Sequence, residues 1–153
     1  MIEIQSVQPA HGEALAKFFE VLQAHGIEKQ FHPHPLTAEV ARDRANYCGN
    51  DLYFVLLEEN DVKGYGMLRG WDEGYDVPSL GIAIHPDMHG EGLGRLLMDF
   101  LRIAALRRGA EKIRLRVYRD NTAAVALYRS LGYELTEDRD ARYLLGFLDL
   151  SCG

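Results

Sequence analysis

Three glycines at alternate positions lie in the segment from His89 to Arg95, which reads HGEGLGR. The segment follows an apolar run that ends at Pro86 and precedes a stripe of leucines at helical spacing. Glycine permits unusual backbone dihedral angles and lets a ligand approach the main chain closely. The free N–H groups at a helix N-terminus bind anions. The segment therefore predicts a pyrophosphate-binding turn, and its alternative is a glycine-rich turn that binds no ligand.

Two other glycine-rich phosphate motifs do not fit this segment. The Walker A motif needs a Lys and then a Ser or Thr after its last glycine, whereas Gly94 is followed by Arg95 and Leu96. The dinucleotide-binding fingerprint has the spacing GxGxxG, whereas this chain has GxGxG after several predicted strands. The predicted phosphate site is therefore of another kind.

Asn121 and Tyr128 form a second group of residues that could do chemistry. They are seven residues apart, so they share one face of a short predicted helix. Asn is a preferred N-cap residue. A Tyr hydroxyl, with an ordinary pKa of about 10, stays protonated at neutral pH and can donate a proton. The simpler alternatives are a helix cap for Asn121 and a core aromatic ring for Tyr128.

These two segments resemble the signatures of the GNAT superfamily of N-acetyltransferases. The first signature, [Q/R]xxGx[G/A], is similar to the run from His89 to Gly94, with His89 in place of Gln or Arg. The second is roughly N-xx-A-xx-(L/F)-Y-xx-x-G-F/Y, and the matching residues are Asn121, Ala124, Leu127, Tyr128, Gly132 and Tyr133. The resemblance covers about residues 50–140 well, and the first 50 residues by element order alone.

The resemblance implies an enzyme that moves the acetyl group of acetyl-CoA to a primary amine by direct attack. In the family, the cofactor arm enters a gap between the fourth and fifth strands. Tyr128 matches a family tyrosine that protonates the leaving thiolate. The residues expected to contact the cofactor are Ile82, Ile84, His89, Gly90, Gly92, Leu93, Gly94, Arg95, Asn121 and Tyr128.

The general base is less clear, because the family's glutamate near the start of the fourth strand corresponds here to Pro78 or Ser79. Asp76 is the predicted base. An exposed turn aspartate is its simpler interpretation, since burial is needed to make a carboxylate an effective base. The other candidates are Asp72, Glu73 and His85.

Acceptor contacts are expected from two places in the chain. The FHPHP segment provides His32 and His34, and an acidic turn is flanked by Trp71 and Tyr75. Aromatic rings together with carboxylates suit a cationic amine. The alternatives are a rigid proline connector and a solvated turn. The acceptor is predicted to be a small-molecule amine; a protein N-terminus, a lysine, or a non-catalytic acyl-CoA-binding module are the alternatives.

The composition restricts the partners of this chain. It has 153 residues, 47% of them hydrophobic and 26% charged, with a net charge of −6. No basic patch indicates nucleic-acid binding, and no apolar stretch is long enough to span a membrane. Cys48 and Cys152 form no CxxC pair and the N-terminus lacks the pattern of a signal peptide, which predicts a cytoplasmic protein. The six histidines lack zinc-site spacing, so no metal is expected. The resemblance also implies a homodimer as one expected state.

The elements that must position these residues follow from hydrophobic periodicity. Strands are expected at 2–7, 52–58, 62–71, 79–86, 112–118, 133–137 and 141–149, and helices at 10–25, 37–47, 92–108 and 121–131, with a hairpin turn at Asn60-Asp61. The order β-α-α-β-β-β-α-β-α-β-β begins with antiparallel neighbours and then contains a β-α-β crossover. We therefore expect a single domain over residues 1–153 of the α/β class. Its mixed central sheet is flanked by helices, as in the GNAT-like fold.

Overall fold

The computed structural model describes residues 1–27, 31 and 33–151. In this part of the chain, seven strands form one sheet in the order β1-β2-β3-β4-β5-β7-β6. Neighbouring strands are antiparallel except for β4 and β5, which are parallel. The strands are β1 (Ile2–Ser6), β2 (Leu52–Glu58), β3 (Asp61–Arg69), β4 (Ser79–Ile84), β5 (Lys112–Tyr118), β6 (Glu134–Glu137) and β7 (Tyr143–Asp149). The predicted element order and mixed sheet are confirmed.

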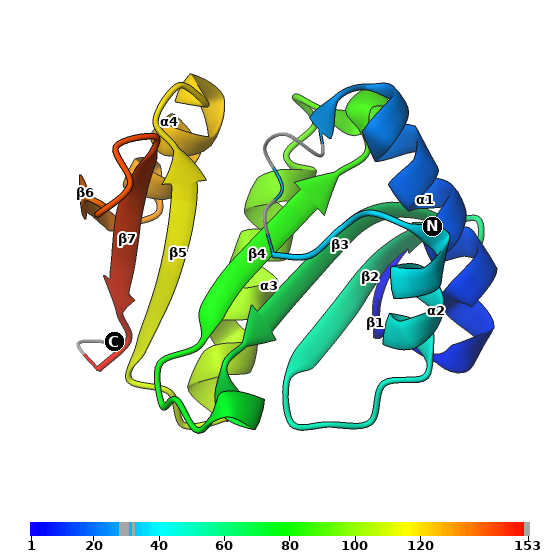
Figure 1. Ribbon diagram of the computed structural model, residues 1–153, viewed down its shortest axis with the longest axis horizontal. Helices are drawn as coiled ribbons and strands as arrows, with labels where there is room; N and C mark the ends of the chain where they lie inside the picture. The colour runs from blue at the N-terminus through cyan, green and yellow to red at the C-terminus, as the bar shows by residue number, and fades with distance from the viewer. Residues whose placement is uncertain (28–30, 32, 152–153) are drawn as a thin grey trace.

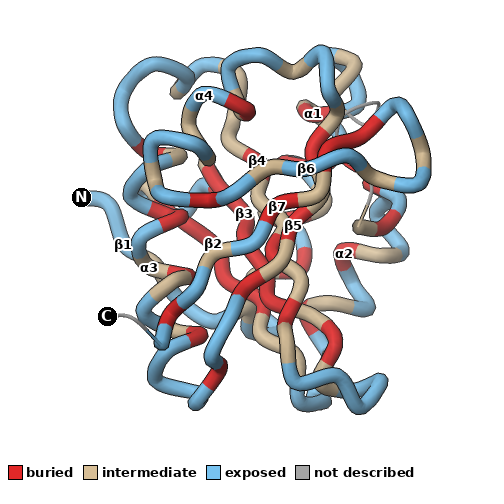
Figure 2. Tube along the Cα trace, turned by 90° about the vertical axis from the view of Figure 1, so that its left-hand side faces the viewer, coloured by how far each residue is buried: buried red, intermediate tan, exposed pale blue. Residues whose placement is uncertain are grey.

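Helices cover both faces of the sheet (Figure 1). On one face lie α1 (Gly12–Ala24) and α2 (Ala38–Ala45), and on the other lie α3 (Leu93–Arg107) and α4 (Thr122–Ser130). Short 3-10 turns stand in the connections: η1 (Pro9–His11), η3 (Trp71–Glu73) and η4 (Pro86–Met88). Each face has its own cluster of buried apolar side chains, and Figure 2 shows these buried segments along the middle of the molecule.

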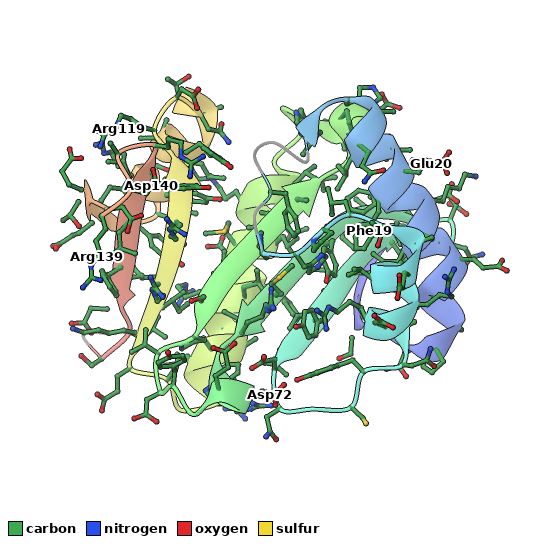
Figure 3. The ribbon with its side chains drawn as sticks, in the orientation of Figure 1. Phe19, Glu20, Asp72, Arg119, Arg139 and Asp140 are labelled. Carbon is green, nitrogen blue, oxygen red and sulfur yellow. The ribbon has the colours of Figure 1, made fainter. Side chains whose placement is uncertain are left out.

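The apolar stripe of α1 explains how this helix docks. Leu15, Phe18, Phe19 and Leu22 recur at helical spacing and are all buried. In Figure 3, Phe19 points toward the sheet and its neighbour Glu20 points outward. Burying side chains of this size stabilises the fold by about 1.5–3 kcal/mol each, which fixes α1 over the central strands.

Two local predictions have different outcomes. Thr37 caps α2 as predicted, because its hydroxyl accepts a hydrogen bond from the Val40 N–H at 3.1 Å. The predicted turn at Asn60-Asp61 is wrong by one residue. Glu58 pairs with Asp61 across the hairpin, and the two turn residues are Glu59 and Asn60, with φ of 53° and 71°. Positive φ at both central positions gives the turn the twist that suits two antiparallel strands.

The feature that shapes the site is the separation of β4 from β5. One residue pair, Ser79 and Arg114, joins these strands in the sheet, and the Arg114 N–H donates to the Pro78 carbonyl at 2.9 Å. Beyond this point the two strands diverge, as Figure 1 shows toward the ends that face α4 and α1. Parallel neighbours normally share evenly spaced hydrogen bonds, so β4 keeps a stretch of backbone edge that β5 does not pair.

None of the helices in the described residues is both long enough and apolar enough to cross a membrane.

Candidate functional site

A cavity of about 540 Å³ lies where β4 and β5 separate. Its walls come from β4, from the turn that leads into α3, and from the first two turns of α4. All of the residues predicted to contact the cofactor line this cavity, namely Ile82, Ile84, His89, Gly90, Gly92, Leu93, Gly94, Arg95, Asn121 and Tyr128. We call it the glycine-turn cavity.

The turn before α3 has the backbone shape of an anion cradle. Gly90 and Gly92 have φ of 82° and 84°, and a Cβ atom on either residue would meet open space. Only glycine adopts such angles without strain. Among the described residues, no group accepts a hydrogen bond from the amides of residues 90–95. These donors at the positive end of the α3 dipole fit a diphosphate.

The unpaired edge of β4 faces the same cavity. The His85 N–H donates to the Lys63 carbonyl of β3 at 2.8 Å. Because backbone groups alternate along a strand, the N–H and C=O groups of Ile82 and Ile84 point away from β3 and into the gap. The Ile84 carbonyl is already satisfied there, since the His89 ring donates to it through Nε2 at 3.2 Å. His89 therefore ties the glycine turn to the end of β4.

Asn121 and Tyr128 stand on the opposite wall. The Asn121 side chain caps α4 by accepting from the Ala124 N–H at 3.3 Å, and it also lines the cavity. The Tyr128 ring is half-buried, and burial raises its pKa to about 12. In the described residues nothing forms a hydrogen bond with its hydroxyl. The hydroxyl is therefore protonated at neutral pH and available to a ligand.

Arg95 lines this cavity and links α3 to α4. Its guanidinium donates through Nη2 to the Ser130 hydroxyl at 2.8 Å, and that hydroxyl donates to the Leu127 carbonyl at 2.6 Å. The chain of bonds fixes the start of α3 against the end of α4. A cationic side chain at this place adds to the positive potential of the glycine turn.

A second cavity of about 500 Å³ adjoins the first and shares Pro33, Leu80, Gly81 and Arg116 with it. We call it the arginine cavity, because Arg69, Arg114 and Arg116 line it. Tyr75 and the carboxylates Glu73 and Asp76 come from the loop before β4, and Phe147 comes from β7. The two cavities therefore adjoin across the gap between β4 and β5.

Pro33 lies where the two cavities adjoin, since it lines both of them. The Arg69 guanidinium donates through Nη1 to the Pro33 carbonyl. A Cβ atom built on Gly81 would lie 2.9 Å from Pro33 Cγ, so only glycine allows this close approach. Within the FHPHP segment, Pro33 lines both cavities and Phe31 lines the glycine-turn cavity.

The two histidines of that segment have different outcomes. His32 lies outside the described residues. His34 corrects the prediction, because it is 9% exposed and lines neither cavity. Its Nδ1 donates to the Pro35 carbonyl at 2.7 Å and its Nε2 accepts from the Tyr65 hydroxyl at 2.8 Å. Burial lowers the His34 pKa to about 4, so the neutral ring is a structural part of the core.

Of the two aromatic residues that flank the acidic turn, only one lines a cavity. Tyr75 is 63% exposed and lines the arginine cavity. Trp71 lines neither cavity, because its ring packs on the core and lies 4.7 Å from the guanidinium carbon of Arg108. This placement corrects the expectation that Trp71 contacts the acceptor.

Of the two aspartates in the acidic turn, one lines a cavity and the other does not. Asp76 lines the arginine cavity and is exposed. Asp72 lines neither cavity, and its carboxylate accepts hydrogen bonds from the Tyr47 hydroxyl and from the Asn50 N–H. Asp72 belongs to η3, and Figure 3 shows it at the lower edge of the molecule. In the described part of the chain, no group of three or more His, Cys, Asp or Glu side chains could hold a metal ion.

The arginines are the site residues that sequence reasoning missed. The alternation in KIRLRVY predicts that Arg114 and Arg116 share one face of β5. The structure shows that this face is the one opposite α3 and α4, since Ile113, Leu115 and Val117 pack against those helices. In the sequence, two arginines on one side of a strand look like an ordinary solvent-exposed face. Only the separation of β4 from β5, which the structure shows, places them in a cavity.

Comparison with known proteins agrees with this geometry. Residues 17–133 match the model of the acetyltransferase (GNAT) family. The chain is 44% identical, over 110 residues that cover 72% of each protein, to the ribosomal protein bS18-alanine N-acetyltransferase of Escherichia coli. It is 33% identical over 96 residues to an acetyltransferase of Sodalis glossinidius, and this match spans 64% of that relative, under two thirds of its length.

Among solved structures, an N-acetyltransferase of Thermoplasma acidophilum in complex with coenzyme A has the same fold. It superposes with a TM-score of 0.76, covering 97% of this chain and 99% of that one, at 15% identity. The family match extends over most of the sheet, including the glycine turn and α4. This chain therefore belongs to the GNAT family of acetyltransferases.

Proposed function

We propose that this chain transfers the acetyl group of acetyl-CoA to a primary amine. The observation that carries the proposal is that the glycine turn, whose amides have no acceptor among the described residues, lines one cavity together with the free edge of β4 and Tyr128. A diphosphate suits the amides, and an extended chain of amide groups suits a strand edge. Membership of the GNAT family supports the same acetyl donor.

The residues of the cavity have the chemistry that acyl transfer needs. The thioester, when bound, supplies the acetyl group. N–H groups of Ile82 and Ile84 that face the gap can donate to a carbonyl oxygen as it gains negative charge. Tyr128, with its pKa of about 12, holds a proton that it can give to a leaving thiolate.

The proton of the attacking amine needs a separate path. Asp76, the expected base, and Glu73 are the carboxylates that line the arginine cavity, and both are exposed to solvent. The attacking amine loses its proton to water at the solvent-exposed edge of the arginine cavity, beside Asp76 and Glu73. Because water itself can accept the proton there, replacing Asp76 with Asn should lower turnover less than removal of the Tyr128 hydroxyl.

A small-molecule amine is the proposed acceptor. The size of the arginine cavity, about 500 Å³, supports a small molecule. The second candidate is a protein N-terminus. It is favoured by 44% identity to the E. coli enzyme whose name specifies an alanine of ribosomal protein bS18.

Calorimetry with coenzyme A, followed by thiol release from acetyl-CoA, tests this function. We expect measurable heat of coenzyme A binding, and faster thiol release with small amines than with peptides that begin with alanine. The absence of coenzyme A binding contradicts the proposal. Binding without thiol release for any amine indicates an acyl-CoA-binding module instead, and a preference for the peptides favours the second candidate.

A further inference from the structure

The floor of the arginine cavity carries a row of basic side chains across three strands. Arg69 of β3 pairs with Ser79 of β4, and Ser79 pairs with Arg114 of β5. Residues that pair across a sheet point to the same face. Neighbouring strands are about 4.8 Å apart, so Arg69 and Arg114 start about 10 Å apart on either side of a small serine. Side chains as long as arginine can converge on one ligand over that distance.

Two of the arginines have no ion-pair partner in the described residues. Arg116 is neutralised by Asp138, with Nη2 2.7 Å from Oδ2, and its guanidinium lies 4.0 Å from the centroid of the Tyr143 ring. Arg69 donates to the uncharged Pro33 carbonyl, and the Arg114 side chain forms neither a hydrogen bond nor an ion pair with any residue that the structure describes.

The residues that line the arginine cavity carry three positive and two negative formal charges, from Arg69, Arg114 and Arg116 against Glu73 and Asp76. Glu73 and Asp76 also line the cavity, but neither forms an ion pair with a described residue. The chain as a whole carries a net charge of −6. A local concentration of guanidinium groups on an acidic protein favours an anion at this one place.

We propose that the acceptor is a small amine that also carries an anionic group, a carboxylate or a phosphate, bound by Arg69 and Arg114. This inference rests on the proposed function and names its acceptor class. Arginine presents its donors in a planar fork that matches carboxylate and phosphate oxygens. The amine end lies toward the junction at Arg116, which lines both cavities.

The walls of the cavity suit the rest of such a molecule. Tyr75 is 63% exposed and Phe147 is 38% exposed, so both offer ring surface to a short carbon skeleton. A diamine or polyamine would bring a second positive charge against the two arginines. The sequence suggested a cationic acceptor, because of the aromatic and acidic residues in the turn. The arginines favour instead a zwitterionic acceptor, with both an amine and an anionic group.

Pairs of acceptors that differ only in the anionic group test this proposal. With saturating acetyl-CoA, thiol release is measured for the common amino acids and their methyl esters, for phosphoethanolamine and ethanolamine, and for putrescine. Charge-assisted hydrogen bonds to arginine predict that kcat/KM for the preferred anionic amine exceeds that of its neutral partner by about 10- to 100-fold. The amino-acid and phosphoethanolamine arms distinguish a carboxylate from a phosphate.

Two substitutions identify the residues responsible. Arg114→Gln should raise KM for the anionic acceptor by about 10-fold or more, with a smaller change in kcat and an unchanged Kd for coenzyme A. Arg107→Gln is the matched control, because it removes the same charge from an exposed position at the end of α3, on the opposite face of the sheet. The retained affinity for coenzyme A shows that each variant is folded.

The inference is overturned if neutral amines, putrescine or peptides are preferred, or if no anionic amine of the panel is bound or acetylated. It is also overturned if Arg107→Gln raises KM for the anionic acceptor as much as Arg114→Gln does. Failure of the proposed function looks different, because it removes coenzyme A binding itself. An enzyme that binds coenzyme A and acetylates only neutral or cationic amines keeps the proposed function and loses this inference.

Discussion

Tyr128 is the residue on which the proposed chemistry depends most directly. Its hydroxyl opens into the glycine-turn cavity and remains protonated at neutral pH, since burial raises its pKa to about 12. We predict that Tyr128→Phe lowers kcat by about 100-fold or more, the usual contribution of a general acid, while the Kd for coenzyme A changes little. Steady-state kinetics and calorimetry measure the two quantities.

Tyr133→Phe is the matched control at the residue scale. The Tyr133 ring lies 6.0 Å from the Tyr128 ring, and its hydroxyl is buried without a hydrogen-bond partner among the described residues. Its removal should leave kcat unchanged, because Tyr133 does not line the glycine-turn cavity. A Tyr128→Phe enzyme with wild-type kcat would refute the proposed acid.

The turn before α3 is the element that recognises the cofactor in this proposal, and backbone geometry rather than side-chain chemistry gives it that capacity. Gly92 has φ of 84° and open space where a Cβ would stand. We predict that Gly92→Ala weakens coenzyme A binding by about 10-fold or more, because a left-handed conformation costs a residue with a Cβ about 1–2 kcal/mol and the methyl group enters the cavity. Calorimetry gives the Kd.

Gly109 provides a control that distinguishes a direct effect on coenzyme A binding from a general loss of stability through backbone strain. Gly109 follows α3, has φ of 92°, and also has open space at its Cβ position, but it lines neither cavity. Gly109→Ala should reduce the free energy of unfolding by a similar amount and leave the Kd for coenzyme A unchanged. Equal losses of affinity in both variants would show that the turn acts only through stability.

At the scale of the whole molecule, the buried pair of His34 and Tyr65 links stability to pH. Burial lowers the His34 pKa from 6.5 to about 4, so between these values the unfolded chain binds more protons than the folded chain. The free energy of unfolding should therefore fall as the pH falls from about 6.5 to 4, by up to about 3 kcal/mol from this group. Above pH 6.5 this contribution is complete.

Urea denaturation at pH 7.5 and pH 5 measures this effect. His34→Gln is expected to lose stability at pH 7.5 and to show a smaller difference between the two pH values than the wild type. His25→Gln, at an exposed position after α1, should keep the wild-type difference. If the His34 variant shows the same difference in free energy of unfolding between pH 7.5 and pH 5 as the wild type, other titratable groups cause the loss of stability in acid.

The sequence by itself determined the element order and the mixed sheet, and its resemblance to the GNAT signatures indicated the residues that line the glycine-turn cavity. These features depend on short-range patterns: alternate burial in β5, helical stripes in α1 and α3, the Thr37 cap, and glycines that have no Cβ. The one-residue error at the hairpin after β2 arose because Glu59 takes a positive φ that its residue type does not favour.

Only the tertiary structure decided which side chains meet across the separated strands. His34 and Trp71 are a histidine and an aromatic residue beside expected binding segments, but long-range packing buries the first against Tyr65 and covers the second with Arg108. Conversely, Arg69 and Arg114 lie 45 positions apart in the sequence, with 114 − 69 = 45, and the sheet register brings them to either side of Ser79. Local pattern cannot reveal such a juxtaposition, because it depends on the register of three strands and on the place where two of them part.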